Sequence, residues 1–128
     1  MKFLFDTHVA IWTLFNDPRL SQAAREIVSN PGNEFVFSVC NIWEIAIKRG
    51  LNAPDFRHNP REIRQYLLRH GCEELTIHSR HVVEVDSLPL IHKDPFDRLL
   101  IAQAMVEGIT LLTADDKIAK YPGPIRKV

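Results

Sequence analysis

The run Phe3-Leu4-Phe5, followed at once by Asp6, constrains the fold more than any other stretch of this chain. A short run that is apolar at every position is typical of a strand buried on both faces, and such strands belong to parallel sheets covered by helices. Ligands of these sheets bind beyond the carboxyl ends of the strands. Asp6 is therefore a candidate functional carboxylate. The alternative is that it only caps the helix that follows.

Strand and helix patterns alternate along the rest of the chain. Further strands are predicted at 34–37, 75–77 and 109–112, and Arg126-Lys127 is compatible with a short edge strand. Helices are predicted at 9–15, 22–29, 39–50, 61–70, 79–85, 95–107 and 117–121. This alternation predicts an α/β fold with a central, mainly parallel sheet. With 128 residues, we expect one domain that spans 1–128.

Composition narrows the classes of protein that this chain can represent. Lys and Arg together number 16, as do Asp and Glu, so no global charge attracts the protein to nucleic acid or to a membrane. No apolar run approaches the roughly 18 residues of a membrane-spanning helix, and Cys40 and Cys72 match neither a disulfide scaffold nor a zinc site. We expect a soluble cytoplasmic protein whose first strand has no signal segment before it.

A basic helix is predicted in the middle of the chain, where two interpretations stay open. Its arginines, with neighbouring aromatic and histidine side chains, would suit a nucleic-acid surface. Ile63, Leu67 and Leu68 show that the same helix also packs, so a solvated basic face is the favoured interpretation.

The second informative stretch is 92–104. Asp94 before Pro95 is a strong helix start, because proline suits the first helical position and the aspartate can accept a backbone N–H. Asp97 lies one turn before Ile101 and shares its face, so we expect its carboxylate to point inward. Asp94 is either a cap or an additional acid of the same site.

The arrangement around Asp6 recurs near the end of the chain. The apolar run 109–112 leads into Thr113, Ala114 and Asp115, so a second buried strand delivers an aspartate beside a threonine. Asp115 can alternatively be a helix cap. In the predicted helix 39–50, Glu44 lies at the flank of the apolar stripe and faces either water or the sheet edge.

In a parallel sheet, four acids would converge at the carboxyl edge: Asp6, Glu44, Asp97 and Asp115. Two carboxylates ~4 Å apart repel by about 4 kcal/mol at an effective dielectric of roughly 20, so such a cluster takes up protons or binds a cation. Oxygen ligands favour Mg²⁺ or Mn²⁺, and His8 and His92 are expected behind the ligands or against substrate. A divalent cation there would promote in-line displacement at phosphorus, so phosphodiester hydrolysis is the predicted reaction.

The sequence resembles the PIN-domain family and, within it, the VapC-like toxin ribonucleases of bacterial and archaeal toxin-antitoxin pairs. The segments that carry the resemblance are Phe5 to His8, Ser38 with Trp43 to Ala46, Asp94 to Ala102, and Leu112 to Asp115. They span nearly the whole chain in the family's order, which makes them far more specific together than singly. The resemblance implies a three-layer α/β/α fold, a Mg²⁺- or Mn²⁺-dependent endoribonuclease, and inhibition by a cognate antitoxin.

The resemblance also assigns roles to the acids. It implies that Asp6 and Asp97 hold the principal metal ion and that Asp115 supports it. It implies that Glu44 orients metal-bound water as the base, with Thr7 and Thr113 as hydroxyl neighbours. Cleavage of RNA would leave 5′-phosphate and 3′-hydroxyl ends. Asp94 is then left as a cap or auxiliary acid.

Two other functions are weighed against this one. A PIN-domain processing nuclease without toxicity shares all of the chemistry. A signalling receiver module would bind Mg²⁺ in a non-catalytic acidic pocket, with Asp6 as phosphoacceptor. That module needs a lysine at the end of its last strand, whereas Lys117 stands in a predicted helix start.

The predicted helix 9–15 is more apolar than one buried face requires. Partly from the family and partly from this surplus, we expect a homodimer that also binds a hydrophobic antitoxin segment. Trp12 or Phe15 would anchor that contact, because aromatic residues are enriched at interfaces. The alternative is that both side chains belong to the core.

Overall fold

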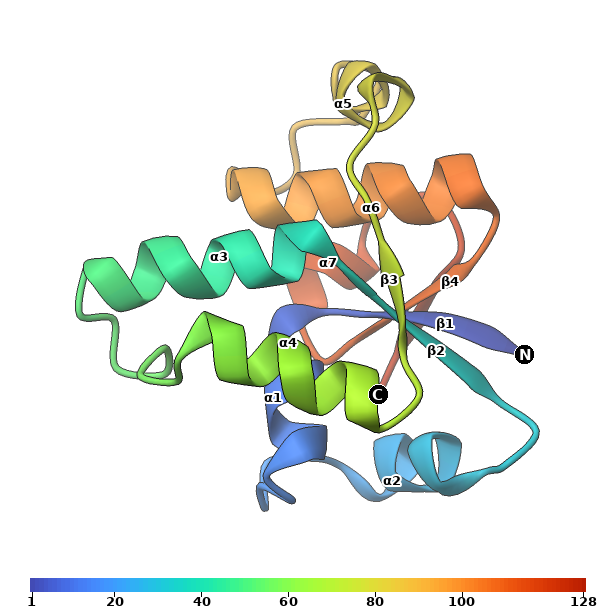
Figure 1. The fold of residues 1–128 in the computed structure, drawn as a ribbon. Helices are drawn as coiled ribbons and strands as arrows, with labels where there is room; N and C mark the ends of the chain where they lie inside the picture. The colour runs from blue at the N-terminus through green and yellow to red at the C-terminus, as the bar shows by residue number, and fades with distance from the viewer.

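The structure of this protein is a computed structural model that describes residues 1–128. Its centre is a five-stranded sheet in which every pair of neighbouring strands is parallel (Figure 1). The strands are β1 (Lys2–Phe5), β2 (Glu34–Ser38), β3 (Glu73–Leu75), β4 (Thr110–Thr113) and β5 (Ile125–Lys127). Their spatial order is β3-β2-β1-β4-β5, so β1 lies in the middle of the sheet. The predicted parallel sheet is confirmed.

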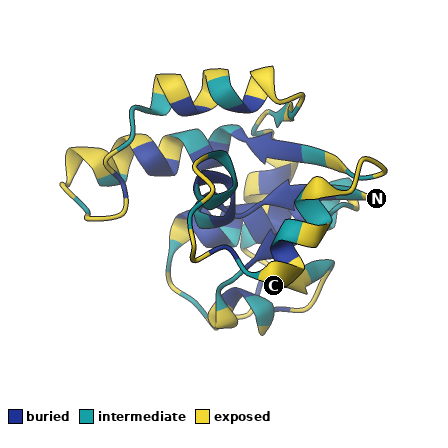
Figure 2. Ribbon diagram, turned by 90° about the horizontal axis from the view of Figure 1, so that it is seen from below, coloured by how far each residue is buried: buried dark blue, intermediate teal, exposed yellow.

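Seven helices surround the sheet: α1 (Thr7–Leu14), α2 (Gln22–Ser29), α3 (Val39–Gly50), α4 (Pro60–Arg69), α5 (Ser79–Val85), α6 (Pro95–Glu107) and α7 (Asp116–Ala119). Figure 1 shows α5 and α6 on one side of the sheet and α1, α2 and α4 on the other. The buried segments gather in the sheet and on the helix faces that pack against it (Figure 2). This arrangement is the three-layer α/β/α fold that the sequence predicted.

The core consists of two apolar clusters, one on each face of the sheet. Phe3 and Phe5 of β1 belong to the cluster beneath α1, α2 and α4, whereas Leu4 between them belongs to the cluster beneath α6. Successive side chains of a strand point to opposite faces, so a strand covered on both faces must be apolar at every position. This explains the short apolar run at the start of the chain.

The third strand departs from the sequence prediction. It lies at Glu73–Leu75 rather than at 75–77, and it pairs with the end of β2. Because it is an edge strand, its two acids reach the surface, where Glu73 pairs with Lys2 and Glu74 with Arg64. Beyond Leu75, the carbonyl of Thr76 accepts a hydrogen bond from Gln103 and the chain turns toward α5.

The other predicted elements are present with bounds shifted by one or two residues, and the edge strand near the carboxyl terminus is confirmed as β5. Helix α1 divides its apolar residues. Val9, Ala10 and Ile11 are buried, Trp12 is partly covered, and Phe15 just beyond the helix is 46% exposed. None of the helices is both long and apolar enough to cross a membrane.

Candidate active site

Asp6 occupies the carboxyl end of the central strand and is both a helix cap and a buried carboxylate. Its Oδ1 accepts a hydrogen bond from the backbone N–H of Thr7 at 2.7 Å, which caps α1. Its Oδ2 accepts one from the hydroxyl of Thr113 at 2.8 Å. The residue is only 4% exposed. The capping and functional interpretations of Asp6 are therefore compatible.

Glu44 faces the sheet edge and not water, because the residue is only 2% exposed. Its Oε1 accepts a hydrogen bond from the hydroxyl of Thr7 at 2.5 Å, and its Oε2 lies 2.5 Å from Nζ of Lys48. Asn41 fixes Thr7 by donating to its hydroxyl at 2.9 Å and to the carbonyl of Phe5 at 3.1 Å. Helix α3 is thus tied to the start of α1 through this carboxylate.

Asp94 and Asp97 have different surroundings at the start of α6. Asp94 caps the helix, since its Oδ1 accepts from the backbone N–H groups of Phe96 and Asp97. Asp97 is 8% exposed, as its apolar face predicted, and its Oδ2 lies 2.7 Å from Nε2 of His92. No donor contacts Asp97 Oδ1. That oxygen is available to a ligand.

Asp115 follows β4 and is less enclosed than the other predicted acids. Its Oδ1 caps α7 by accepting from the backbone N–H groups of Lys117 and Ile118. The residue lines a hollow of about 210 Å³ beyond the ends of β1 and β4, whose walls are Asp6, His8, Trp12, Asp55, Ala114 and Asp115. This is the edge at which ligands of parallel sheets bind.

Burial and mutual repulsion make the acids of this edge reluctant to ionise. Burial raises the pKa of Asp6 to about 7, and the charges of Glu44 and Asp115 add to the effect against the hydrogen bonds from Thr113 and Thr7. Burial raises the pKa of Asp97 to about 9, with further repulsion from Asp6, Asp94 and Glu44. A divalent cation would reverse these shifts, because it stabilises the ionised carboxylates.

The donor set suits a hard divalent cation. Asp6, Asp97 and Asp115 offer carboxylate oxygens, the ligands that Mg²⁺ and Mn²⁺ prefer. The most compact ligand group is formed by His92, Asp94 and Asp97, whose ligand atoms lie within 4.8 Å of one another. Asp6 and Asp115 lie outside that group. Asp97 is thus the acid common to the predicted metal ligands and to this compact group.

Three residues near the acids were missed or left vague by the sequence. Lys48 contacts both Glu44 and Asp94, a role that only the four-residue spacing of Glu44 and Lys48 on a helix could have suggested. Asn41 carries no signal of its own in the sequence. His92 was expected near the ligands or the substrate, and it lies directly against Asp97.

Ser38 is one of the residues on which the predicted resemblance rests. It caps α3, and its hydroxyl donates a hydrogen bond to Gln103.

A sequence model of the PIN domain matches residues 3–124 of this chain. The chain belongs to the PIN-domain family. The predicted resemblance to this family is thereby confirmed over almost the whole sequence. No curated protein sequence gives a significant match.

Solved structures with the same fold come from toxin-antitoxin complexes. A chain of VapBC2 from Rickettsia felis, bound to a promoter DNA fragment, superposes with a TM-score of 0.72 at 13% identity, covering 100% of this chain and 99% of that chain. A chain of DNA-bound VapBC from Salmonella typhimurium gives 0.68 at 18% identity, covering 99% and 98%. VapBC-5 from Mycobacterium tuberculosis gives 0.62 at 17% identity, covering 99% and 97%. At these identities the likeness establishes the fold.

Proposed function

We propose that this protein is a Mg²⁺- or Mn²⁺-dependent endoribonuclease and the toxin of a toxin-antitoxin pair. The observation that carries the proposal is the state of two buried carboxylates, Asp6 and Asp97. Asp6 accepts hydrogen bonds only from neutral groups, and no lysine or arginine pairs with Asp97. Buried charges in proteins are paired or coordinate a metal ion. Membership of the PIN-domain family supports the same conclusion.

The roles proposed for the acids follow from where they lie. Asp6 and Asp97 would hold the metal ion, and Asp115 would support it from the rim of the hollow. Glu44 would help to orient the attacking water through its negative charge, with its two oxygens held by Thr7 and Lys48. Mg²⁺ or Mn²⁺, when bound, lowers the pKa of coordinated water and stabilises negative charge on phosphate oxygens.

Thr7 and Thr113 would keep the carboxylates in place while the reaction proceeds. The hydroxyl of Thr7 donates to Glu44, and that of Thr113 donates to Asp6. Both threonines are fully buried, so water cannot replace these hydrogen bonds. The hydroxyl neighbours implied by the resemblance would therefore act as positioning groups.

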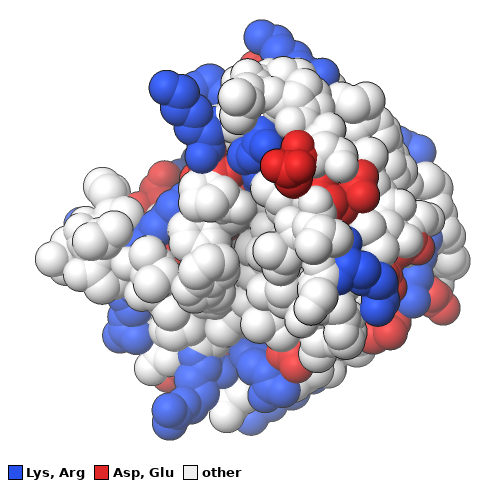
Figure 3. Space-filling view, turned by 90° about the horizontal axis from the view of Figure 1, so that it is seen from above, with Lys and Arg blue, Asp and Glu red and all other residues white.

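An RNA strand is the proposed substrate, held beside the acids by local features and not by overall charge. Trp12 and His8 form the aromatic wall of the hollow that contains Asp6 and Asp115, and bases stack well on such side chains. Arg49 and Arg57 line an adjoining hollow with Phe56, whose ring contacts His8. On the face seen in Figure 3, Lys and Arg form separate groups, with uncharged and acidic side chains between them.

The test is cleavage of RNA by the purified protein with Mg²⁺ or Mn²⁺ and with a chelator. Activity should disappear with the chelator. In Asp97→Asn the rate of cleavage should fall by roughly 100-fold or more, which corresponds to several kcal/mol in the activation free energy. Asp86→Asn is the matched control, since Asp86 is an exposed acid at the end of α5. Undiminished cleavage by Asp97→Asn would show that Asp97 is not part of the active site.

Toxicity separates the proposed toxin from a PIN-domain processing nuclease. Expression in a bacterial host should arrest growth, and Asp97→Asn should relieve the arrest. A short neighbouring reading frame for a DNA-binding antitoxin would support the toxin. An isolated gene without effect on growth would favour the processing nuclease. No observation on this structure favours the receiver-like signalling module.

Two exposed apolar surfaces support the proposed partners, a cognate antitoxin and a second copy of the chain in a cytoplasmic homodimer. Trp43, Ile47 and Leu51 follow one another at intervals of four residues along α3 and its end, each more than 40% exposed. Phe15 lies exposed beyond α1, stacked on His58 at 4.4 Å. Exposed aromatic and aliphatic residues of this kind are common interface anchors.

A further inference from the structure

Lys48 lies among the acids of the site and is held there from several sides. Its Nζ is 2.5 Å from Oε2 of Glu44 and 3.2 Å from Oδ2 of Asp94. The same atom lies 4.9 Å from the ring centre of Phe56 and 5.6 Å from that of Phe96. Its side chain is 25% exposed. An ordinary surface ion pair is mobile and screened by solvent, whereas this ammonium group is half-buried between two carboxylates and two aromatic rings.

The contacts of Lys48 divide the acidic cluster into two parts. In the first part, every oxygen of Glu44 and Asp94 already accepts a hydrogen bond. Lys48 donates to both carboxylates, the hydroxyl of Thr7 donates to the other oxygen of Glu44, and the backbone at the start of α6 donates to the other oxygen of Asp94. In the second part, Asp6 receives only neutral donors and Asp97 keeps Oδ1 free. The direct contacts of Lys48 are therefore confined to Glu44 and Asp94. In the other half of the cluster no lysine or arginine pairs with a carboxylate, and the one partner that can carry a charge is His92, 2.7 Å from Asp97.

We infer that Lys48 is a positioning residue that takes the place of a second divalent cation. Its ammonium group contacts both Glu44 and Asp94, offsets one of their two negative charges and occupies the oxygens that a second ion would need. The site therefore binds one metal ion, on Asp6 and Asp97. This inference rests on the proposed metal-dependent function and specifies its metal stoichiometry. It also explains how Glu44 can stay buried without a metal ion of its own.

A purely structural ion pair within α3 would not need the second contact. Glu44 and Lys48 are four residues apart on the helix, a spacing that often produces pairs on exposed surfaces. Asp94 is 46 residues away in sequence and belongs to the start of α6. It also belongs to the compact ligand group with His92 and Asp97, where a second ion would find its ligands. Lys48 therefore competes for ligands that a second ion would require.

The experiment measures Mn²⁺ binding to the full chain by calorimetry and by electron paramagnetic resonance. The wild type should bind one Mn²⁺ and show no spin coupling between ions. Lys48→Met should bind two Mn²⁺ ions and give a spin-coupled signal. Lys48→Arg keeps the positive charge and should bind one Mn²⁺ ion, as the wild type does. Lys120→Met is the control, because Lys120 is an exposed lysine without an ion-pair partner, and it should behave as the wild type.

The outcomes separate the inference from the function on which it rests. Two Mn²⁺ ions bound to the wild type, or a single ion in a folded Lys48→Met variant, would overturn the inference and leave the metal-dependent nuclease intact. A wild type that binds no Mn²⁺ would overturn both. If Lys48→Met unfolds below the assay temperature, the number of Mn²⁺ ions bound by the wild type and by Lys48→Gln tests the inference in its place. One ion in the wild type and two in Lys48→Gln are then expected.

Discussion

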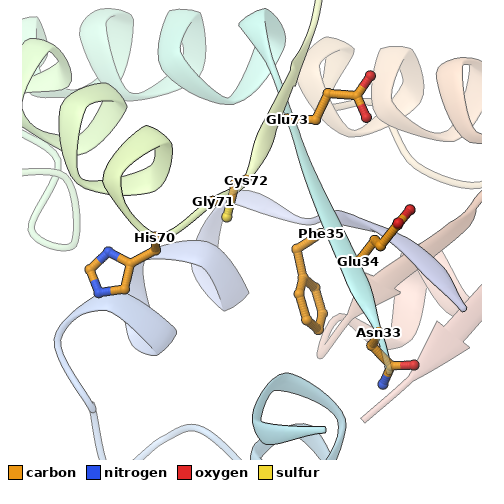
Figure 4. A pocket seen from close by; sticks show the side chains of 7 residues that line it. All are labelled: Asn33, Glu34, Phe35, His70, Gly71, Cys72 and Glu73. Atoms are coloured by element: carbon orange, nitrogen blue, oxygen red, sulfur yellow. The ribbon is translucent and has the colours of Figure 1, made fainter. Parts of the chain in front are cut away.

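The carboxyl edge and the amino edge of the sheet each combine a hollow with acidic side chains, but the acids have different surroundings. The hollow at the amino edge is the larger, with a volume of about 310 Å³ against about 210 Å³, and Glu34 and Glu73 line it. Figure 4 shows the side chains of Glu34 and Glu73 pointing to the same side, away from that of His70. Both glutamates are exposed, and Lys2 pairs with Glu73. At the carboxyl edge, Asp6, Glu44 and Asp97 are buried together.

This difference shows that neither the size of a hollow nor the presence of acids identifies the site. Exposed carboxylates are solvated and need no further partner. Buried carboxylates repel one another and require protons or cations. The strands run parallel, so their buried carboxyl ends meet at one edge, where the helices that follow them begin. The chemistry is therefore expected at that edge.

The comparison predicts its largest effect for Asp6→Asn against Glu34→Gln. Asparagine also caps helices, so Asp6→Asn should fold while losing the negative charge that the proposed metal ion would need. We expect cleavage of RNA to fall by roughly 100-fold or more, equivalent to several kcal/mol in the activation free energy. Glu34→Gln should stay within about twofold of the wild type, since the amino edge takes no part. The measurement is kcat/KM for both variants. Equal losses would mean that the carboxyl edge has no special part in cleavage.

The second prediction concerns the stability of the metal-free protein at different pH. The pKa values of Asp6 and Asp97 are raised to about 7 and about 9, above an unfolded value of roughly 3.9. The folded protein therefore binds more protons than the unfolded chain across this window, so the free energy of unfolding falls as pH rises from about 4 to 9. The slope is at most about 1.4 kcal/mol per pH unit for each group.

Thermal melts in chelator between pH 5 and 9 measure this decline. Tm should drop by several degrees per pH unit, and excess Mn²⁺ should oppose the drop, because the cation binds the deprotonated carboxylates. The double variant Asp6→Asn with Asp97→Asn should have a much flatter profile, whereas Glu34→Gln should follow the wild type. A decline of the same size in the double variant would assign it to other groups.

Much of the geometry of the candidate site was predictable because its positions depend on regular elements. The apolar runs before Asp6 and Asp115 end at the carboxyl ends of β1 and β4, as a buried parallel sheet requires. The inward direction of Asp97 followed from helical periodicity. These inferences used only the local repeat of each element and the parallel direction of the strands.

The remaining features depend on contacts that the sequence does not encode locally. Glu44 lies at the flank of the apolar face of α3, where a small rotation of the helix decides between water and the site. Lys48 meets Asp94 only because α3 and α6 pack side by side. The position of β3 was misjudged because edge strands tolerate acids such as Glu73 and Glu74, which the hydrophobic pattern excluded.

The third prediction compares one aromatic residue from each hollow. Trp12 belongs to the hollow with Asp6, and Phe35 belongs to the hollow at the amino edge, where it stacks on Phe3 and Phe5. Both side chains pack on the core, so replacement by alanine should cost each protein about 2 kcal/mol or more in unfolding free energy. Only Trp12→Ala should raise the KM for RNA, by roughly tenfold, because base stacking contributes about 1–3 kcal/mol per base.

Denaturant unfolding and steady-state cleavage on the same preparations separate these effects. A KM that rises equally in Phe35→Ala would mean that the increase reflects general destabilisation. Antitoxin affinity should be measured in parallel, since Trp12 or Phe15 was also predicted to anchor that partner. Loss of antitoxin binding in Phe15→Ala with an unchanged Tm would support the exposed end of α1 as its contact.

The smallest predicted effect compares the two ends of a single strand, β4. Thr113 at the carboxyl end donates its hydroxyl hydrogen to Asp6, whereas Thr110 at the amino end makes no side-chain hydrogen bond. Thr113→Val removes a donor to a buried carboxylate, which raises the pKa of Asp6 further, since this hydrogen bond lowers it. A hydrogen bond to a charged group contributes about 1.5–3 kcal/mol, so activity should fall by roughly tenfold or more at neutral pH.

Part of that loss should return at higher pH, because ionisation of Asp6 restores the carboxylate that the metal requires. Thr110→Val is the matched control and should leave both activity and its pH profile unchanged. The measurement is kcat/KM from pH 6 to 9 for the two variants and the wild type. A shift of the profile toward higher pH in Thr113→Val alone assigns the effect to Asp6. A uniform loss without such a shift would instead mean that the valine disturbs the packing around β4, and that the hydroxyl does not control ionisation at this edge.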